Sequence, residues 1–191
     1  MGVKDREHVE VTSIAELRRW LADQPPGRDS VWLVHFKKHV SEKYVSWPDL
    51  VRTCLCFGWV DSQVKTVDAD RVKHLISPRR AGSTWSAVNK RLIDELEAAG
   101  LMTDAGRRVV ERAKSDGSWT FLDEIEALVV PADLQAALDQ QPTAAATWAA
   151  YPDSEKKQSL FQLKSAKKPE TRLRRLQKII SNAVDGRRSW T

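Results

Sequence analysis

The chain has 191 residues, a length that fits one domain or one domain with a helical extension. Apolar residues make up 41% of it and charged residues 30%, which is the profile of a soluble globular protein. The N-terminus has no apolar segment typical of a secretion signal, and no stretch approaches the roughly eighteen apolar residues of a transmembrane helix. The two cysteines suit free thiols in a reducing compartment, so we expect a cytoplasmic protein.

The net charge of +5 is unevenly distributed along the chain. Residues 155–191 hold eleven Lys and Arg side chains against three Asp and Glu side chains, a net charge of +8. The remaining residues therefore have a net charge of −3. The C-terminal fifth is where we expect an acidic partner to bind.

The first half of the chain alternates between helix and strand patterns. Residues 12–24 predict a helix capped by Ser13, and residues 31–38 alternate with the period of two that is typical of a strand. A second helix is predicted from Ser46, which forms a capping box with Asp49, to Gly58 in a left-handed turn. Residues 59–67 and 71–77, separated by the turn sequence Asp-Ala-Asp, predict a β-hairpin.

The rest of the chain reads as helical. Helices are predicted from Ser83 or Thr84 to Gly100, from a Thr103 cap to Gly117, and in four proline-punctuated segments that follow, at residues 129–142, 143–152, 153–166 and 169–186. We expect an α+β fold in which a small antiparallel sheet, a strand plus the hairpin, is covered by helices. Residues 10–127 would form this core and residues 128–187 an all-helical part packed on it, together one globular unit.

The sequence Cys-Leu-Cys-Phe-Gly-Trp-Val-Asp-Ser at residues 54–62 raises the question of a reactive or metal site. Cys54 lies on the apolar stripe of its helix, and Cys56 lies about 200° around the helix from it, so the two thiols cannot share one metal ion. His35 and His39 could share a strand face, but Lys37 between them argues against a metal pair. We expect one buried and one half-buried thiol, no metal and no cofactor; the common nucleotide-binding, hydrolase and metalloprotease motifs are absent from the sequence.

Asp61 and the segment 77–90 are the strongest candidates for a binding site. Asp61, at the start of the hairpin, could act as a general base or position a ligand, but a structural role in the turn or a pair with Lys65 is favoured. Arg79 and Arg80 precede Gly82 and a helix start, an arrangement that suits a phosphate or carboxylate. The alternative is a polar loop with an ordinary cap, its arginines paired with Asp61 or Asp68. If hairpin and loop converge, they form a groove lined by Trp59, Asp61, Gln63, Lys65, Arg79, Arg80, Ser83, Thr84, Trp85 and Asn89.

The last predicted helix has a basic face. Phosphate contacts need such charge, so the face could bind nucleic acid or an anionic membrane, although a solvated basic face is favoured. Its members are Lys167, Lys168, Arg172, Arg174, Arg175 and Lys178.

Four segments in the order VWLVHFKK, LCFGWVDSQVK, ISPRRAGSTWSAVNK and AKKPETRLRRLQKI resemble the YdeI/OmpD-associated family of bacterial bacteriocin-protection proteins, over about residues 10 to 187. Val60-Asp61-Ser62 stands where that family more often has Ile-Asp-Gly. The resemblance implies a soluble cytoplasmic protein linked to resistance against antimicrobial peptides and to an outer-membrane porin. It transfers no reaction, cofactor or catalytic residue.

Three functions follow as hypotheses. The preferred one is a non-enzymatic stress or protection protein that binds a small anion or an acidic peptide segment in the groove. The second is an enzyme of unknown class with Asp61 as acid or base and Arg79 holding an anionic substrate. The third is a nucleic-acid or anionic-membrane binder that uses the basic face.

Overall fold

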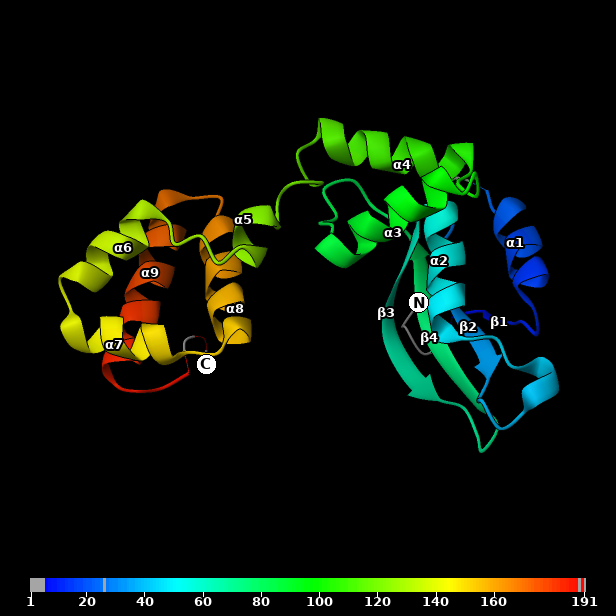
Figure 1. Cartoon of the computed structure of the whole chain (residues 1–191), viewed down its shortest axis with the longest axis horizontal. Coiled ribbons are helices and arrows are strands. Elements are labelled where there is room, and N and C mark those ends of the chain that lie inside the picture. Colours follow the sequence, from blue (N-terminus) through cyan, green and yellow to red (C-terminus); the bar gives the residue numbers. More distant parts are fainter. Residues whose placement is uncertain (1–5, 26, 189, 191) are drawn as a thin grey trace. The chain divides into compact units, whose positions relative to one another are not determined.

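A computed structural model of the chain describes residues 6–25, 27–188 and 190. The chain forms two compact units, the first ending at Thr120 and the second beginning at Phe121. Figure 1 shows the first unit in blue to green and the second in yellow-green to red. Among the described residues, no helix is both long enough and apolar enough to cross a membrane.

The first unit is built on a four-stranded sheet with the strand order β1-β2-β4-β3. The hairpin strands β3 and β4 pair antiparallel, as do β2 and β4, whereas β1 pairs parallel with β2. The predicted α+β class is confirmed, but the sheet is mixed because of β1, which at three residues is too short to show an alternating pattern. The bounds are β1 (His8–Glu10), β2 (Val31–Phe36), β3 (Trp59–Thr66) and β4 (Arg71–Pro78).

Helices α1 (Ile14–Ala22) and α2 (Trp47–Cys56) pack on one face of this sheet, and α2 crosses in front of it in Figure 1. The predicted caps are present: the hydroxyl oxygens of Ser13 and Ser46 accept the backbone N–H groups of Glu16 and Asp49. The core between helices and sheet is formed by apolar side chains, including Leu17, Leu21, Val31, Leu33, Leu50, Cys54, Trp59 and Ile76.

Helix α3 (Ala87–Ala98) begins later than predicted. Its N-cap is Ser86, whose hydroxyl accepts the backbone N–H of Asn89, so the predicted start at Ser83 or Thr84 is wrong. Residues 79–86 form a loop instead. Contacts with other parts of the first unit hold this segment, and no local pattern in the sequence reveals them.

Helix α4 (Asp104–Ser115) meets the end of α2 at very close range. Thr103, its predicted cap, donates its N–H and its hydroxyl to the carbonyl of Cys56. A Cβ at Gly106 would lie 2.2 Å from that same carbonyl oxygen. Contact between the two backbones therefore requires glycine at this position.

The second unit is all helical, as predicted. Its core joins side chains from every helix, including Ile125, Leu134, Trp148, Leu160 and Ile179. Helix α5 was not predicted, and the predicted packing of the helical part on the N-terminal core stays a prediction. The helices are α5 (Asp123–Glu126), α6 (Ala132–Asp139), α7 (Pro142–Ala150), α8 (Asp153–Lys164) and α9 (Pro169–Val184).

Candidate functional site

A β-bulge in β3 divides the residues that the sequence groups around Asp61. Asp61 pairs with Ile76, but the register then shifts, and Lys65 pairs with Lys73. Because Ile76 and Lys73 point to opposite faces of β4, Asp61 and Lys65 do too. Lys65 lies over the ring of Trp32 at 5.1 Å on that other face, and the structure does not bring it to Asp61.

The two other members from β3 also lie outside any groove. Trp59 is only 4% exposed and packs edge-on against Trp20 with ring centres 5.4 Å apart, so it belongs to the core. Gln63 is exposed and lies within the bulge. Of the candidates on this strand, Asp61 is the one whose charge acts on Arg79.

Arg79 is a buried guanidinium directly after β4. The residue is 5% exposed, and its central carbon lies 3.7 Å from the centre of the Trp85 ring. One Nη1–H donates to the carbonyl of Thr84 at 3.0 Å, whereas Nε has no hydrogen-bond partner among the described residues. Burial lowers the pKa of Arg79 to about 10, and the negative charge of Asp61 partly opposes this shift. The charge of Asp61 thus acts on Arg79, while their meeting in one cleft stays a prediction.

The loop after Arg79 is held at several points. The Arg79 N–H donates to the carbonyl of Gly58, and Nη2 of Arg112 donates to the carbonyl of Arg79 at 2.8 Å. Gly82, in a left-handed conformation with φ of 72°, donates its N–H to the carboxylate of Asp116. Hydrogen bonds from Ser118 and from Gly82 lower the pKa of Asp116. The backbone N–H of Gly82 is therefore already bound by the carboxylate of Asp116.

The exposed side of the loop is formed by Arg80 and by the partly exposed Ser83 and Thr84. Arg80 makes no ion pair within the described ranges of the chain. Asn89, also partly exposed, lies in the first turn of α3. These are the polar side chains that the loop and the first turn of α3 expose to solvent.

Trp85 and Trp119 form an aromatic pair at this loop, and the sequence analysis identified only Trp85. Trp85 is 1% exposed and is a core anchor rather than a groove wall. Its ring centre lies 5.0 Å from that of Trp119, and Lys114 lies over Trp119 at 5.2 Å. The sequence analysis missed Trp119. The available signal was its position shortly after the turn at Gly117.

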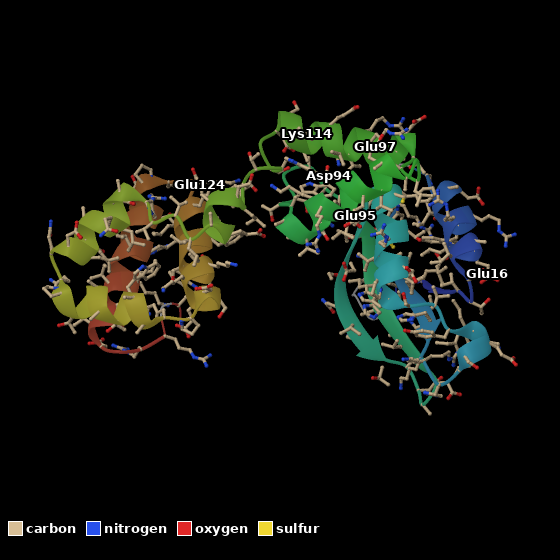
Figure 2. The ribbon with its side chains drawn as sticks, viewed as in Figure 1. Glu16, Asp94, Glu95, Glu97, Lys114 and Glu124 are labelled. Carbon is tan, nitrogen blue, oxygen red and sulfur yellow. The ribbon has the colours of Figure 1, made fainter. Side chains whose placement is uncertain are left out.

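Two acidic side chains on α3 pair with arginines that lie outside this loop. Figure 2 shows Asp94, Glu95 and Glu97 on α3 and Lys114 on α4. Glu95 pairs with Arg52 at 2.6 Å, and Glu97 pairs with Arg107 at 2.9 Å. Two of these carboxylates are therefore paired with arginines outside the loop.

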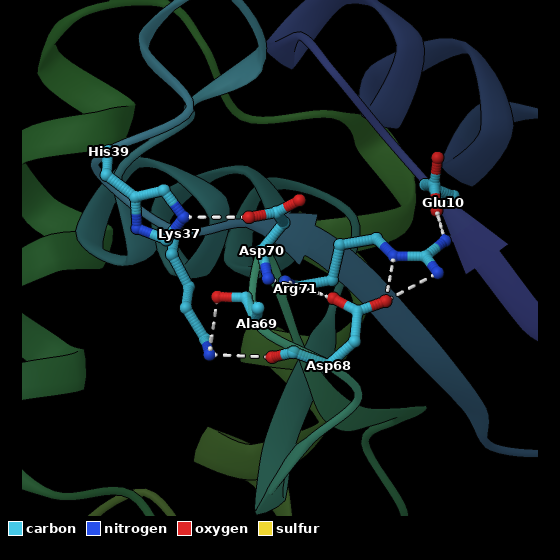
Figure 3. A network of polar contacts seen from close by, with 7 residues as sticks. All are labelled: Glu10, Lys37, His39, Asp68, Ala69, Asp70 and Arg71. Atoms are coloured by element: carbon cyan, nitrogen blue, oxygen red, sulfur yellow. Dashed lines mark hydrogen bonds and ion pairs between the residues drawn. The ribbon is translucent and has the colours of Figure 1, made fainter.

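The turn between β3 and β4 holds a second polar cluster, shown in Figure 3. Arg71 binds Asp68 through two nitrogens and Glu10 through a third, and these bonds raise the pKa of Arg71 and lower that of Asp68. Lys37 donates to the carbonyl oxygens of Asp68 and Ala69. Asp68 is thus used within the turn and is not the partner of Arg79 or Arg80.

Both cysteines are buried free thiols, including Cys56, which was predicted to be half-buried. Burial raises the pKa of Cys54 to about 12, with a smaller contribution from Asp61, and burial also raises the pKa of Cys56. The thiolate nucleophile is therefore disfavoured at neutral pH. Over the described ranges, no group of three or more His, Cys, Asp or Glu residues is placed to hold a metal ion.

The basic face of α9 is partly used inside the second unit. Arg172 binds Asp133 through two nitrogens, and Arg175 donates to the carbonyl of Gln162. Lys178 lies 4.9 Å from the centre of the Trp190 ring. Exposed charge is left at four positions, Lys167, Lys168, Arg174 and Lys178.

Comparison with known proteins matches the two units to two different family models. Residues 9–109, more than half of the chain, match the family model described as "Domain of unknown function (DUF8412)". Residues 127–186 match the model described as "Bacteriocin-protection, YdeI or OmpD-Associated", which confirms the predicted resemblance over the second unit. No curated protein and no solved structure gives a significant match.

Proposed function

Because the chain belongs to the DUF8412 family through residues 9–109 and carries a bacteriocin-protection, YdeI or OmpD-associated domain at residues 127–186, we propose that it is a bacteriocin-protection protein that acts by binding an anion. The ligand is a small molecule or an acidic peptide segment that presents a phosphate or a carboxylate. It binds at the loop 79–86, and the site includes Arg79, Arg80, Ser83 and Thr84.

One observation carries the proposal: among the residues that the structure describes, no carboxylate is hydrogen-bonded to the buried guanidinium of Arg79, and its Nε–H has no partner. A buried charge without a close counter-ion costs free energy, and its field is less screened than that of a surface charge. An anion over the loop would offset this cost. Arg80 and the hydroxyl groups of Ser83 and Thr84 supply hydrogen-bond donors on the exposed side.

Asp61 provides a further test, because its carboxylate would compete with the ligand for the positive charge of Arg79. Its charge opposes the lowering of the Arg79 pKa by burial and so stabilises the same cation that the ligand would stabilise. We expect Asp61→Asn to bind the anion more tightly. A purely structural role for Arg79 predicts no such gain.

The test is a titration of the full chain with inorganic phosphate and with acetate, followed by thermal unfolding and calorimetry. A ligand that binds only the folded state raises the melting temperature by mass action. Arg80→Ala and Arg79→Met, which keeps an unbranched stem against Trp85, are each expected to weaken binding by about 1.5–3 kcal/mol. Arg108→Ala removes an exposed arginine of α4 and serves as the control. Binding of both anions that is unaffected by both loop variants would overturn the proposal.

Protection itself is tested in cells with the doubly substituted Arg79→Met, Arg80→Ala protein. We propose that the protein acts in the cytoplasm, where the two buried free thiols suit the reducing conditions. The double variant should accumulate normally but leave cells sensitive to the bacteriocin. Normal protection by the double variant would separate anion binding from protection.

A further inference from the structure

The second unit holds a small cavity between α5, α8 and the segment that leads into α6. Its volume is about 120 Å³. The floor is deeply buried, with Ile125 4%, Leu160 3% and Leu163 1% exposed. Pro131 and Val129 complete the apolar lining, and Val129 is 52% exposed at the opening.

The volume limits what can enter. A cavity of roughly 150 Å³ lined by aliphatic side chains holds one benzene molecule. The cavity of the second unit therefore fits one branched aliphatic group about the size of a leucine side chain. It is too small for a whole cofactor, since sites for such ligands have volumes of roughly 300 Å³ or more.

Charged side chains at the cavity indicate which polar group the ligand carries beside its aliphatic group. Arg172 already has a carboxylate partner, because it binds Asp133 through two nitrogens and the carbonyl of Leu163 through a third. Lys164 is different: its ammonium binds only one carboxylate among the described residues, that of Glu124 at 2.6 Å. The Glu124 side chain is 67% exposed, so this ion pair is at the surface and is readily exchanged.

The backbone at the opening is held in an unusual conformation. Leu128 has a φ of 56°, the only positive value at a non-glycine residue within the described ranges. It ends α5 in a Schellman arrangement, in which the N–H groups of Leu128 and Val129 donate to the carbonyl oxygens of Ile125 and Glu124. Non-glycine residues in this region concentrate at binding sites, and here the turn holds Val129 at the opening.

We propose that this cavity binds a carboxylate that carries a branched aliphatic group, with the aliphatic group on the floor and the carboxylate on Lys164 in place of Glu124. The C-terminal residue of a polypeptide and a free branched-chain acid share this chemistry. The site is separate from the loop at Arg79, and it is formed wholly by residues of the second unit.

The test is a titration of the full chain with N-acetyl-leucine, which mimics a peptide C-terminus, and with 4-methylpentanoate, followed by amide chemical shifts of Ile125, Val129 and Leu163. We expect binding at millimolar concentration. Binding of N-acetyl-leucine alone identifies a polypeptide end, and binding of both identifies free acids as well. Equal binding of 4-methylpentanamide, or no shift with either acid, would overturn the proposal.

Two variants with opposite expected effects make the test specific. Lys164→Met should weaken binding about tenfold or more, whereas Glu124→Gln should tighten it several-fold by freeing the ammonium. Lys167→Met, at an exposed lysine that is not part of the lining, is the matched control. Arg79→Met should leave this binding unchanged, so failure of the loop proposal and failure of this one are distinguishable.

Discussion

His35 and His74 lie on the helix-covered face of the sheet and stack with Trp47 of α2. The ring centres of Trp47 and His74 are 3.4 Å apart, and those of the two histidines are 5.2 Å apart. His35 is 4% exposed, and neither of its ring nitrogens has a hydrogen-bond partner among the described residues. Burial lowers the pKa of His35; burial and the nearby His35 lower the pKa of His74 to about 4. The sequence analysis considered a metal pair of His35 and His39 and argued against it, and the register of β2 and β4 places His35 beside His74.

This cluster predicts that the protein loses stability in mild acid. Since the pKa of His74 is lowered on folding, from 6.5 to about 4, its contribution is fully present above pH 6.5 and is lost as the pH falls toward 4. We expect the free energy of unfolding to decrease by an amount on the order of 2 kcal/mol over this window, after allowance for partial exposure. Urea unfolding at several pH values measures it. His74→Phe should flatten the dependence and His39→Gln, at an exposed position, should not; equal slopes for all three proteins would contradict the assignment.

The contact between α2 and α4 shows how one glycine sets the distance between two elements. Gly106 faces the carbonyl oxygen of Cys56, which also accepts two hydrogen bonds from Thr103. No pattern within α4 predicts this, because the obstacle is backbone of another helix. The bulge in β3 is of the same kind, since it moves Lys65 to the opposite face through pairing with β4.

Gly106→Ala is therefore expected to be strongly destabilising. The new Cβ would lie 2.2 Å from backbone oxygen and 2.9 Å from the Met102 side chain, so the helices must separate. We expect a loss of about 3 kcal/mol or more in the free energy of unfolding, measured with urea. Gly117→Ala is the matched control, because its Cβ would meet nothing within 4 Å and only the φ of 78° opposes it, at a cost of about 1 kcal/mol. Equal losses for the two variants would show that the helix contact is not limiting.

At the scale of the whole molecule, each unit has its own hydrophobic core. The second unit's core is formed entirely by residues from Phe121 onward, whereas two clusters centred on the sheet and on α3 and α4 belong to the first. The two family matches fall on opposite sides of the same division.

We therefore predict that a fragment of residues 121–191 folds by itself. Its circular dichroism should show a helical protein, and its thermal unfolding should be a single cooperative transition. A fragment with helical content but no cooperative transition would show that the second unit depends on the first.

The fold class and most helix boundaries follow from patterns within the sequence. Ser13, Ser46 and Thr103 cap their helices through bonds to residues three positions away, and Gly58 adopts the left-handed turn expected of it. Helix α5 was missed because its left-handed end is at Leu128 rather than at glycine. Leu128 packs against the core of the second unit.

Sequence by itself determined the features that depend on nearby residues, namely the caps, the amphipathic faces and the hairpin. It also indicated the family relationship of the second unit. Only the tertiary structure decided which charges meet. Asp61 acts on Arg79, Arg172 binds Asp133, and Lys164 lies at a cavity. These relations depend on strand register and helix packing between distant residues, and burial then sets the strength of each interaction, which no local pattern specifies.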